Sequence, residues 1–299
     1  MQIELKRPVM VRCRMMTTGT DLKTIYKPIE KPLTSVRENL AHLQSDFLKL
    51  LSPSAQIEKP YSSGKLLRPA LCLFSAGLSG AKDIDEFVDM ATALEAFHLG
   101  AIAHDDVIDG AIIRRGMSSL NARWSDHAAV LVGDYLIARG LDFLRRYECP
   151  KVLDTVVKCL RQMAEGELND LANGKNRTTL EQCLDLARAK TASLFGTACC
   201  APAYYLNIPH AENLEQFGVN LGTAFQLIDD LLDLTEPQET LGKAACNDLV
   251  CRKKTLPILF LKESLGTDGQ KRLEAISGKP LSKEDQEWVA EVVEQTSTY

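Results

Sequence analysis

Two short runs of aspartate residues, far apart in the chain, share the same spacing. The first reads DDVID at residues 105–109, and the second reads DDLLD at residues 229–233. On an α-helix, residues four apart lie on one face, about 5.4 Å apart along the axis. The carboxylates of each run would repel one another unless a divalent cation such as Mg²⁺ binds them. The runs therefore predict Mg²⁺ ligands among Asp105, Asp106, Asp109, Asp229, Asp230 and Asp233.

One such run by itself is also typical of a solvated acidic helix end. Both runs, however, follow strongly apolar stretches, at residues 98–104 and 217–228. Two copies with one spacing arise by chance far less often than one. We therefore favour the metal site over two solvated helix ends.

Basic residues accompany both aspartate runs. They precede the first run, follow it closely, or follow the second: Lys65, Arg68, Arg114, Arg115, Lys243, Lys253 and Lys254. Each basic group alone is typical of a solvated surface. Mg²⁺ bound to carboxylates usually keeps a phosphate ligand, and Arg and Lys are the common protein cations that contact phosphate oxygens. Together with the aspartate runs, the basic residues predict that metal and cations capture a diphosphate jointly.

The segments that carry these residues have helical periodicity. Apolar residues recur at spacings of three and four in the longer segments, at residues 33–51, 84–109, 126–146, 151–173, 179–206 and 211–234. Alternating strand patterns are scarce, and Gly, Pro and Asn separate the segments. The sequence therefore predicts an all-α, single-domain bundle of about ten or more helices around a deep central cavity.

Composition excludes several other classes of protein. The chain of 299 residues is 45% hydrophobic and 25% charged, which is typical of a globular protein. Its net charge of -5 gives no basic footprint for nucleic acid, and no apolar run is long enough for a transmembrane helix. Its 9 cysteines include no CxxC pair and favour buried thiols in a reducing cytoplasm over a zinc site or a disulfide framework.

The order of the motifs resembles that of the trans-prenyltransferases, the head-to-tail isoprenyl diphosphate synthases. The resemblance covers roughly residues 22–295, and beside the aspartate runs its motifs are Gly64-Lys65-x-x-Arg68-Pro69, Glu95-x-x-His98, Arg114-Arg115-Gly116, Lys190-Thr191, Gln226-x-x-Asp229 and Gly242-Lys243. It implies the isoprenoid synthase fold, usually as a homodimer. It also implies condensation of isopentenyl diphosphate with an allylic diphosphate, by ionisation, condensation and elimination, with about three Mg²⁺ ions per active site.

The resemblance also implies a role for each matching residue. Asp105, Asp109 and Asp229 would bind Mg²⁺, with Asp106, Asp230 and Asp233 more peripheral. The cations on the allylic diphosphate would be Arg114, Lys190, Lys243 and Lys253. The isopentenyl diphosphate pocket would contain Lys65, Arg68, His98 and Arg115. The catalytic group would be Lys190, Thr191 and Gln226, with the oxygens of Thr191 and Gln226 facing the developing carbocation.

Residues below the first aspartate run bear on product length. The helix that carries Asp105 should line the cavity, and one turn below it lie two small residues, Gly100 and Ala101. Small side chains there would let a growing product pass, and Phe97, one turn deeper, is a candidate floor. We expect products of C20 or longer, about four or more five-carbon units.

Three alternatives compete with the synthase. A noncatalytic or regulatory subunit of a heteromeric synthase stays open, although all six motif aspartates are present. A class I terpene cyclase is disfavoured by the second aspartate run. A di-iron protein would need a second ExxH pair. We expect residues 1–20 to be a disordered extension and residues 21–299 to be a prenyltransferase domain lacking the family's last helices.

Overall fold

The computed structural model describes residues 21–52, 64–114, 116–173, 179–236 and 245–295. The described elements, in chain order, are α1 (Leu22–Tyr26), η1 (Lys27–Ile29), α2 (Glu30–Leu51), α3 (Leu67–Leu78), η2 (Ile84–Phe87), α4 (Val88–Ile108), β1 (Ile113–Arg114), β2 (Met117–Ser118), α5 (Leu120–Arg123), α6 (Asp126–Leu144), η3 (Arg145–Tyr147), α7 (Pro150–Asn173), α8 (Leu180–Ala187), η5 (Arg188–Ala192), α9 (Ser193–Tyr205), α10 (Ala211–Thr235), α12 (Asn247–Val250), α13 (Leu256–Ser264), α14 (Thr267–Ile276) and α15 (Lys283–Gln295). The predicted all-α fold is confirmed, and the sheet content of the described residues is one short antiparallel pair, β1 with β2.

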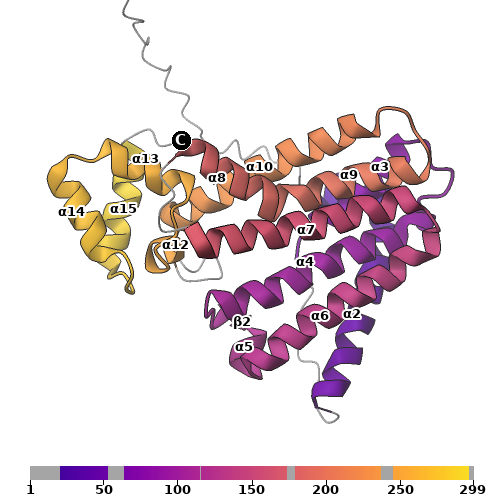
Figure 1. The fold of residues 1–299 in the computed structure, drawn as a ribbon, viewed down its shortest axis with the longest axis horizontal. Coiled ribbons are helices and arrows are strands. Elements are labelled where there is room, and N and C mark those ends of the chain that lie inside the picture. The colour runs from indigo at the N-terminus through magenta and orange to yellow at the C-terminus, as the bar shows by residue number, and fades with distance from the viewer. Residues whose placement is uncertain (1–20, 53–63, 115, 174–178, 237–244, 296–299) are drawn as a thin grey trace, which may run out of the picture.

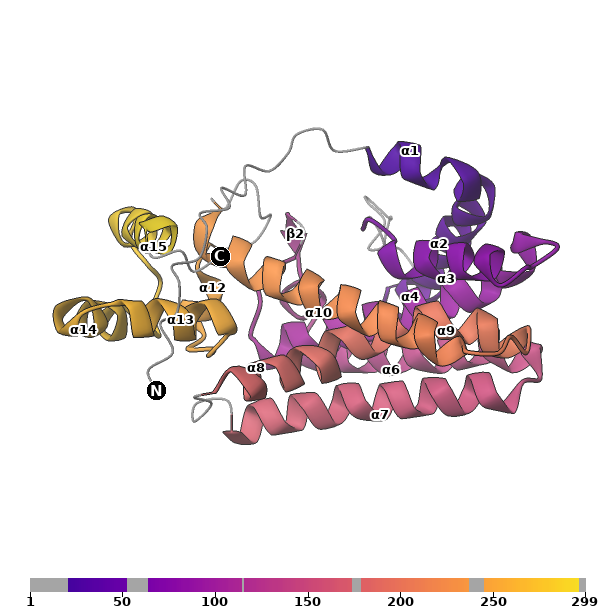
Figure 2. The same cartoon turned by 90° about the horizontal axis from the view of Figure 1, so that it is seen from above.

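The long helices form a bundle in which α4 is the central member. Helices α4, α6, α7, α9 and α10 run along the length of the molecule, and α12–α15 gather at one end (Figures 1 and 2). Most of α4 is buried, because its apolar residues cover nearly the whole circumference of the helix rather than one stripe. Its Leu94 and Phe97 pack in a core shared with α2, α3 and α6. A second, smaller core joins α12–α15 to the end of α10.

Glycines set how closely the helices approach the site. On α10, a Cβ at Gly218 would lie 2.5 Å from the carbonyl oxygen of Phe195, and one at Gly222 would lie 2.7 Å from Ala192 Cα. Such contacts are too short for any side chain, so α9 and α10 pack with their backbones almost touching. This close packing fixes the register between η5–α9 and α10, the elements that carry two of the predicted motifs.

Close packing at glycines also joins α4 to α6. A Cβ at Gly133 would lie 2.2 Å from the His104 ring, and one at Gly140 would lie 2.6 Å from the Phe97 ring. Gly100 also faces α6, since its Cβ would lie 3.0 Å from the carbonyl oxygen of Gly133. The two helices are therefore locked together along the face of α4 that carries Phe97, Gly100 and His104.

None of the described helices is both long enough and apolar enough to cross a membrane. The expectation for residues 1–20 falls outside the described part of the chain.

Candidate active site

A cavity of about 1210 Å³ opens between α3, α4, α7, η5 and α10. Its lining brings together most of the residues that the sequence singles out, namely Lys65, Arg68, His98, Asp105, Asp109, Arg114, Lys190, Thr191, Gln226, Asp229, Asp230 and Lys253. The two aspartate runs thus contribute to one space, from α4 and from α10. Arg115 and Lys243 lie outside the described residues.

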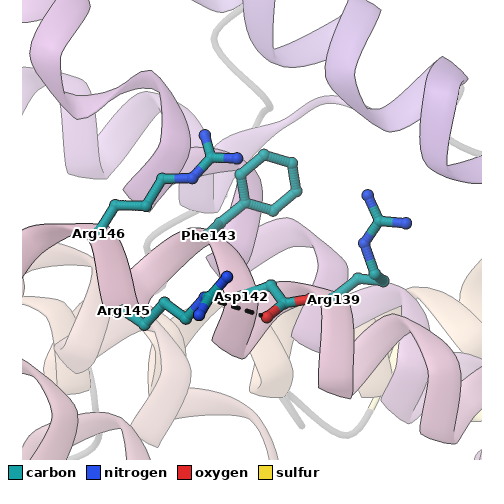
Figure 3. A pocket seen from close by; sticks show the side chains of 5 residues that line it. All are labelled: Arg139, Asp142, Phe143, Arg145 and Arg146. Carbon is teal, nitrogen blue, oxygen red and sulfur yellow. Dashed lines mark ion pairs between the residues drawn. The ribbon is translucent and has the colours of Figure 1, made fainter.

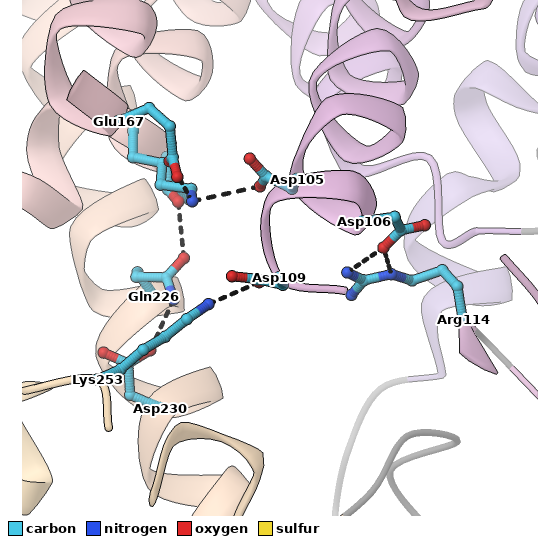
Figure 4. Close-up of polar contacts among 10 residues, drawn as sticks. Asp105, Asp106, Asp109, Arg114, Glu167, Gln226, Asp230 and Lys253 are labelled. Carbon is cyan, nitrogen blue, oxygen red and sulfur yellow. Dashed lines mark hydrogen bonds and ion pairs between the residues drawn. The ribbon is translucent and has the colours of Figure 1, made fainter. Parts of the chain in front are cut away.

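The carboxylates of the first run lie beside two lysines. Lys253 Nζ donates to Asp109 Oδ2 at 2.6 Å, and Lys190 Nζ lies 3.4 Å from Asp105 Oδ2 (Figure 4). Burial acts to lower the pKa of Lys253, but the Asp109 carboxylate outweighs it, so that its pKa lies above its usual value. Burial likewise acts to lower the pKa of Lys190, and the carboxylates of Asp105 and Glu167 outweigh it. Both lysines therefore stay cationic, and a diphosphate entering here would meet positive charge beside the aspartates.

The negative charge of Asp105 is compensated only in part. Burial raises the pKa of the Asp105 carboxyl, and Lys190, acting in the opposite direction, offsets this only in part. Lys190 also pairs with a second carboxylate, Glu167, whose negative charge adds to the effect of burial in raising the pKa of Asp105. Asp105 is thus held where additional positive charge, such as that of a divalent cation, would stabilise it.

A chain of hydrogen bonds links η5 to the second aspartate run. Thr191 Oγ1 donates to Gln226 Oε1 at 2.6 Å, and Gln226 Nε2 donates to Asp230 Oδ1 at 2.7 Å. Thr191 belongs to a π-helical turn, an arrangement often found at functional sites. The two bonds fix the orientation of the Gln226 amide at the cavity wall.

Two of the six motif aspartates do not line the cavity. Asp106 is fully buried and accepts two hydrogen bonds from Arg114, from Nε at 2.8 Å and from Nη2 at 2.5 Å (Figure 4). Asp233 is also fully buried, and its Oδ2 accepts from the Asp248 backbone N–H at 2.9 Å.

Asp106 and Asp233, which were expected as peripheral metal ligands, thus lie outside the cavity lining in this structure. Asp106 follows Asp105 by one residue, which rotates it by about 100° around the helix, away from the cavity. Asp233 shares a helical face with Asp229, but the start of α12 packs against it. We assign a structural role to both residues. Asp106 holds Arg114 at the cavity, and Asp233 anchors the start of α12.

The remaining aspartates suit a hard divalent cation. Asp105, Asp109, Asp229 and Asp230 present oxygen ligands from two helices on one cavity. Within the described residues, no three carboxylate, imidazole or thiol groups already gather at the spacing that holds a metal ion. Mg²⁺ takes one or two carboxylates from a protein and completes its coordination with water and phosphate oxygens.

The predicted isopentenyl diphosphate pocket occupies the α3 side of the same cavity. Lys65 and Arg68 flank Leu66, which has a left-handed backbone conformation with φ 52° at the start of α3. The Tyr26 hydroxyl donates to the Lys65 carbonyl at 2.9 Å, and the Arg68 guanidinium lies 4.5 Å from the centroid of the Phe195 ring. Sequence reasoning missed Tyr26 and Phe195, because neither lies in a recognisable motif and both contacts are long-range.

A second, smaller pocket of about 180 Å³ lies near the end of α6 and lacks this chemistry. Its three arginines are ion-paired: Arg145 with Asp142 at 3.3 Å, Arg139 with Asp46 at 3.5 Å and Arg146 with Asp89 at 2.6 Å. Figure 3 shows the Arg145–Asp142 pair beside Phe143. It contains neither aspartate run, so the larger cavity is the candidate active site.

Comparison with known proteins agrees with this site. The family model for polyprenyl synthetase matches residues 52–296. The chain belongs to the polyprenyl synthetase family. The resemblance to the trans-isoprenyl diphosphate synthases, which are prenyltransferases, is thereby confirmed.

Individual family members are similar over most of the chain. Heptaprenyl diphosphate synthase component 2 of Geobacillus stearothermophilus is 34% identical over 244 residues, covering 80% of this chain and 75% of that protein. Octaprenyl diphosphate synthase of Haemophilus influenzae is 34% identical over 242 residues, covering 79% and 72%. The crystal structure of a polyprenyl synthase from Caulobacter crescentus, complexed with calcium and isoprenyl diphosphate, superposes with a TM-score of 0.82 at 30% identity, covering 93% and 85%.

Two acidic residues at this cavity were missed from the sequence. Glu167 and Asp170 of α7 line the cavity among apolar side chains such as Leu160 and Met163. The signal that could have found them is their spacing, since they fall on the otherwise apolar face of an amphipathic helix. Acidic residues on such a face need a partner in the folded protein.

Of the three residues expected to set product length, two line the cavity and one does not. Ala101 and Phe97 line the cavity, with Phe97 almost fully buried. Gly100, also expected to bear on product length, does not line it: a Cβ at this position would point to α6 and lie 3.0 Å from the carbonyl oxygen of Gly133.

Proposed function

We propose that this chain is a Mg²⁺-dependent trans-polyprenyl diphosphate synthase that condenses isopentenyl diphosphate with an allylic diphosphate. One observation carries the proposal. Aspartates of both runs line one cavity, together with the cations predicted for both diphosphates. Family membership supports the same reaction.

The aspartates that line the cavity would hold the metal. We assign Asp105, Asp109, Asp229 and Asp230 as ligands of about three Mg²⁺ ions that also bind the allylic diphosphate. When bound, Mg²⁺ supplies charge neutralisation of the leaving diphosphate.

The cations of the cavity divide between the two substrates. Lys190, Lys253 and Arg114 would bind the allylic diphosphate, since all three already lie against the first aspartate run. Lys65, Arg68 and His98 would bind isopentenyl diphosphate on the α3 side. The separation lets one diphosphate leave while the other stays attached to the growing chain.

The hydrogen-bonded pair Thr191 and Gln226 would stabilise the carbocation left when the allylic C–O bond breaks. Their oxygens are fixed dipoles at the cavity wall, so they need no reorganisation as positive charge develops. The double bond of isopentenyl diphosphate then attacks the allylic carbon, and a proton is lost to the departed diphosphate. Each cycle adds one five-carbon unit and releases one diphosphate.

The size of the cavity supports a product of C20 or longer. A cavity of about 150 Å³ accommodates one benzene molecule, and this one is about eight times larger. Several relatives carry names of longer-chain enzymes, such as octaprenyl diphosphate synthase and all-trans-nonaprenyl-diphosphate synthase. The proposal includes the homodimer and the cytoplasmic location that the sequence led us to expect.

A second candidate function is supported by one comparison. Two relatives are named component 2 of a heptaprenyl diphosphate synthase, which points to an enzyme of more than one component. In that case this chain would carry the aspartate runs yet need a second chain for full activity. Activity of the purified chain by itself separates the two candidates.

The test is a condensation assay with the purified chain. It is incubated with Mg²⁺, isopentenyl diphosphate and, separately, dimethylallyl, geranyl or farnesyl diphosphate, and the dephosphorylated products are sized by chromatography. A ladder ending at one length supports the synthase. Absence of product with all three primers supports the second candidate, and a cyclic hydrocarbon refutes the proposed reaction.

A variant pair sharpens the assay. Asp229→Asn removes a proposed metal ligand and should lower kcat by at least about a hundredfold. Asp154→Asn removes the same charge from an exposed site on α7 and should leave the rate unchanged. Equal rates for the two variants would contradict the assignment of the metal site.

A further inference from the structure

We infer that Glu167 is a positioning residue for the diphosphate site, because its carboxylate holds the Lys190 ammonium in the cavity. The inference rests on the proposed function for its choice of substrate. It adds a residue that no motif and no resemblance assigns.

The contact itself is direct. Lys190 Nζ forms an ion pair with Glu167 Oε2, while the nearest Asp105 oxygen lies 3.4 Å from the same nitrogen (Figure 4). The side chains of Glu167 and Lys190 are 17% and 26% exposed, so the pair is shielded from most of the solvent. It therefore lies in a setting where an ion pair is stronger than on the surface.

The backbone brings the two residues together. Gly166 lets α7 approach the π-helical turn, since a Cβ there would lie 3.0 Å from Ala189 Cβ and 3.4 Å from the Lys190 backbone nitrogen. The π-turn itself spans Arg188–Ala192 and places Lys190 at the cavity wall. The close approach at Gly166 and the π-turn thus together bring the side chains of Glu167 and Lys190 into contact.

Charge and flexibility explain why a second carboxylate is needed. A lysine side chain is long and has high rotamer entropy, so one partner holds it loosely. Asp105 is also a proposed metal ligand, and charge that it shares with a divalent cation is no longer available to Lys190. Glu167 therefore keeps the ammonium beside the diphosphate and draws it away from Asp105.

The test is a double-mutant cycle on the full chain with Glu167→Gln, Lys190→Met and both substitutions together. Two quantities are measured: KM for each substrate, and equilibrium binding of inorganic pyrophosphate by calorimetry, with MgCl₂ and with EDTA. Glu167→Gln should raise the KM for the allylic diphosphate and the pyrophosphate Kd by about tenfold, and change the KM for isopentenyl diphosphate by less than about twofold. In the Lys190→Met background it should add less than about twofold.

A matched control lies on the same helix. Glu165→Gln removes an equal charge from a side chain that is 61% exposed and 3.9 Å from Arg161, and it should leave both quantities unchanged. Circular dichroism and thermal melting check that Glu167→Gln is folded. Glu167→Asp keeps the charge and should restore at least part of the pyrophosphate affinity.

Two results would overturn the inference. One is pyrophosphate binding and kinetics of Glu167→Gln equal to those of the unsubstituted chain. The other is an undiminished Glu167→Gln effect in the Lys190→Met background, which would mean that Glu167 acts on the metal or substrate directly. If the unsubstituted chain makes no product with any primer, the proposed function fails, while the pyrophosphate titration still decides the role of Glu167.

Discussion

A bulky residue at position 101 should shorten the product. Ala101 lines the cavity one helical turn, about 5.4 Å, below Asp105 on α4. That distance is roughly the length of one five-carbon unit. A phenylalanine side chain at this point would project across the path of the growing chain, directly beneath the diphosphate site.

The size of the effect follows from where the ring lies rather than from how much volume it fills. A benzene-sized group needs about 150 Å³, which is about one eighth of the cavity volume of about 1210 Å³. The loss is concentrated one turn below the aspartates, so Ala101→Phe should stop elongation after about two or three units. Space farther along the cavity would then be unreachable. The assay sizes the dephosphorylated products from dimethylallyl, geranyl and farnesyl diphosphates.

A control substitution at the same position separates the effect of side-chain size from the effect of mutating that position. Ala101→Ser keeps a small side chain and should leave product length unchanged. An unchanged product length for Ala101→Phe, in a folded and active variant, would refute the view that the product passes along this face of α4. Loss of activity with geranyl and farnesyl diphosphates alone, and not with dimethylallyl diphosphate, would still support it.

Three further outcomes are expected. Gly222→Ala should lower the free energy of unfolding by about 1–3 kcal/mol, since its Cβ would lie 2.7 Å from a backbone atom of η5. In denaturant melts the control Gly266→Ala, where nothing lies within 4 Å of the added Cβ, should be close to neutral. Equal stabilities of the two variants would contradict the packing argument. Tyr26→Phe should raise the KM for isopentenyl diphosphate severalfold with little change in the KM for the allylic substrate, because the Tyr26 hydroxyl donates to the Lys65 carbonyl. A higher KM for the allylic substrate alone would place Tyr26 at the other pocket. EDTA should abolish product formation and added Mg²⁺ should restore it, whereas activity that persists in EDTA would rule out the metal assignment.

The sequence by itself determined the chemistry of the site. The aspartate runs and the Lys65–Arg68 pair were found from residue types and spacing, and the Lys190–Thr191 pair from the resemblance to a known family. The structure places most of these residues at one cavity. This succeeded because helical periodicity is local: it fixes which face a residue occupies relative to its neighbours in the chain. The all-α fold followed from the same periodicity.

The tertiary structure alone decided which of those residues face the cavity. Asp106 is buried against Arg114, and Gly100 packs against α6, because each depends on a partner segment that helical periodicity does not specify. Glu167 entered the site for the same reason, through the close approach of α7 to η5. Local spacing fixes the direction of a side chain on its own helix, whereas only packing between helices fixes what it meets.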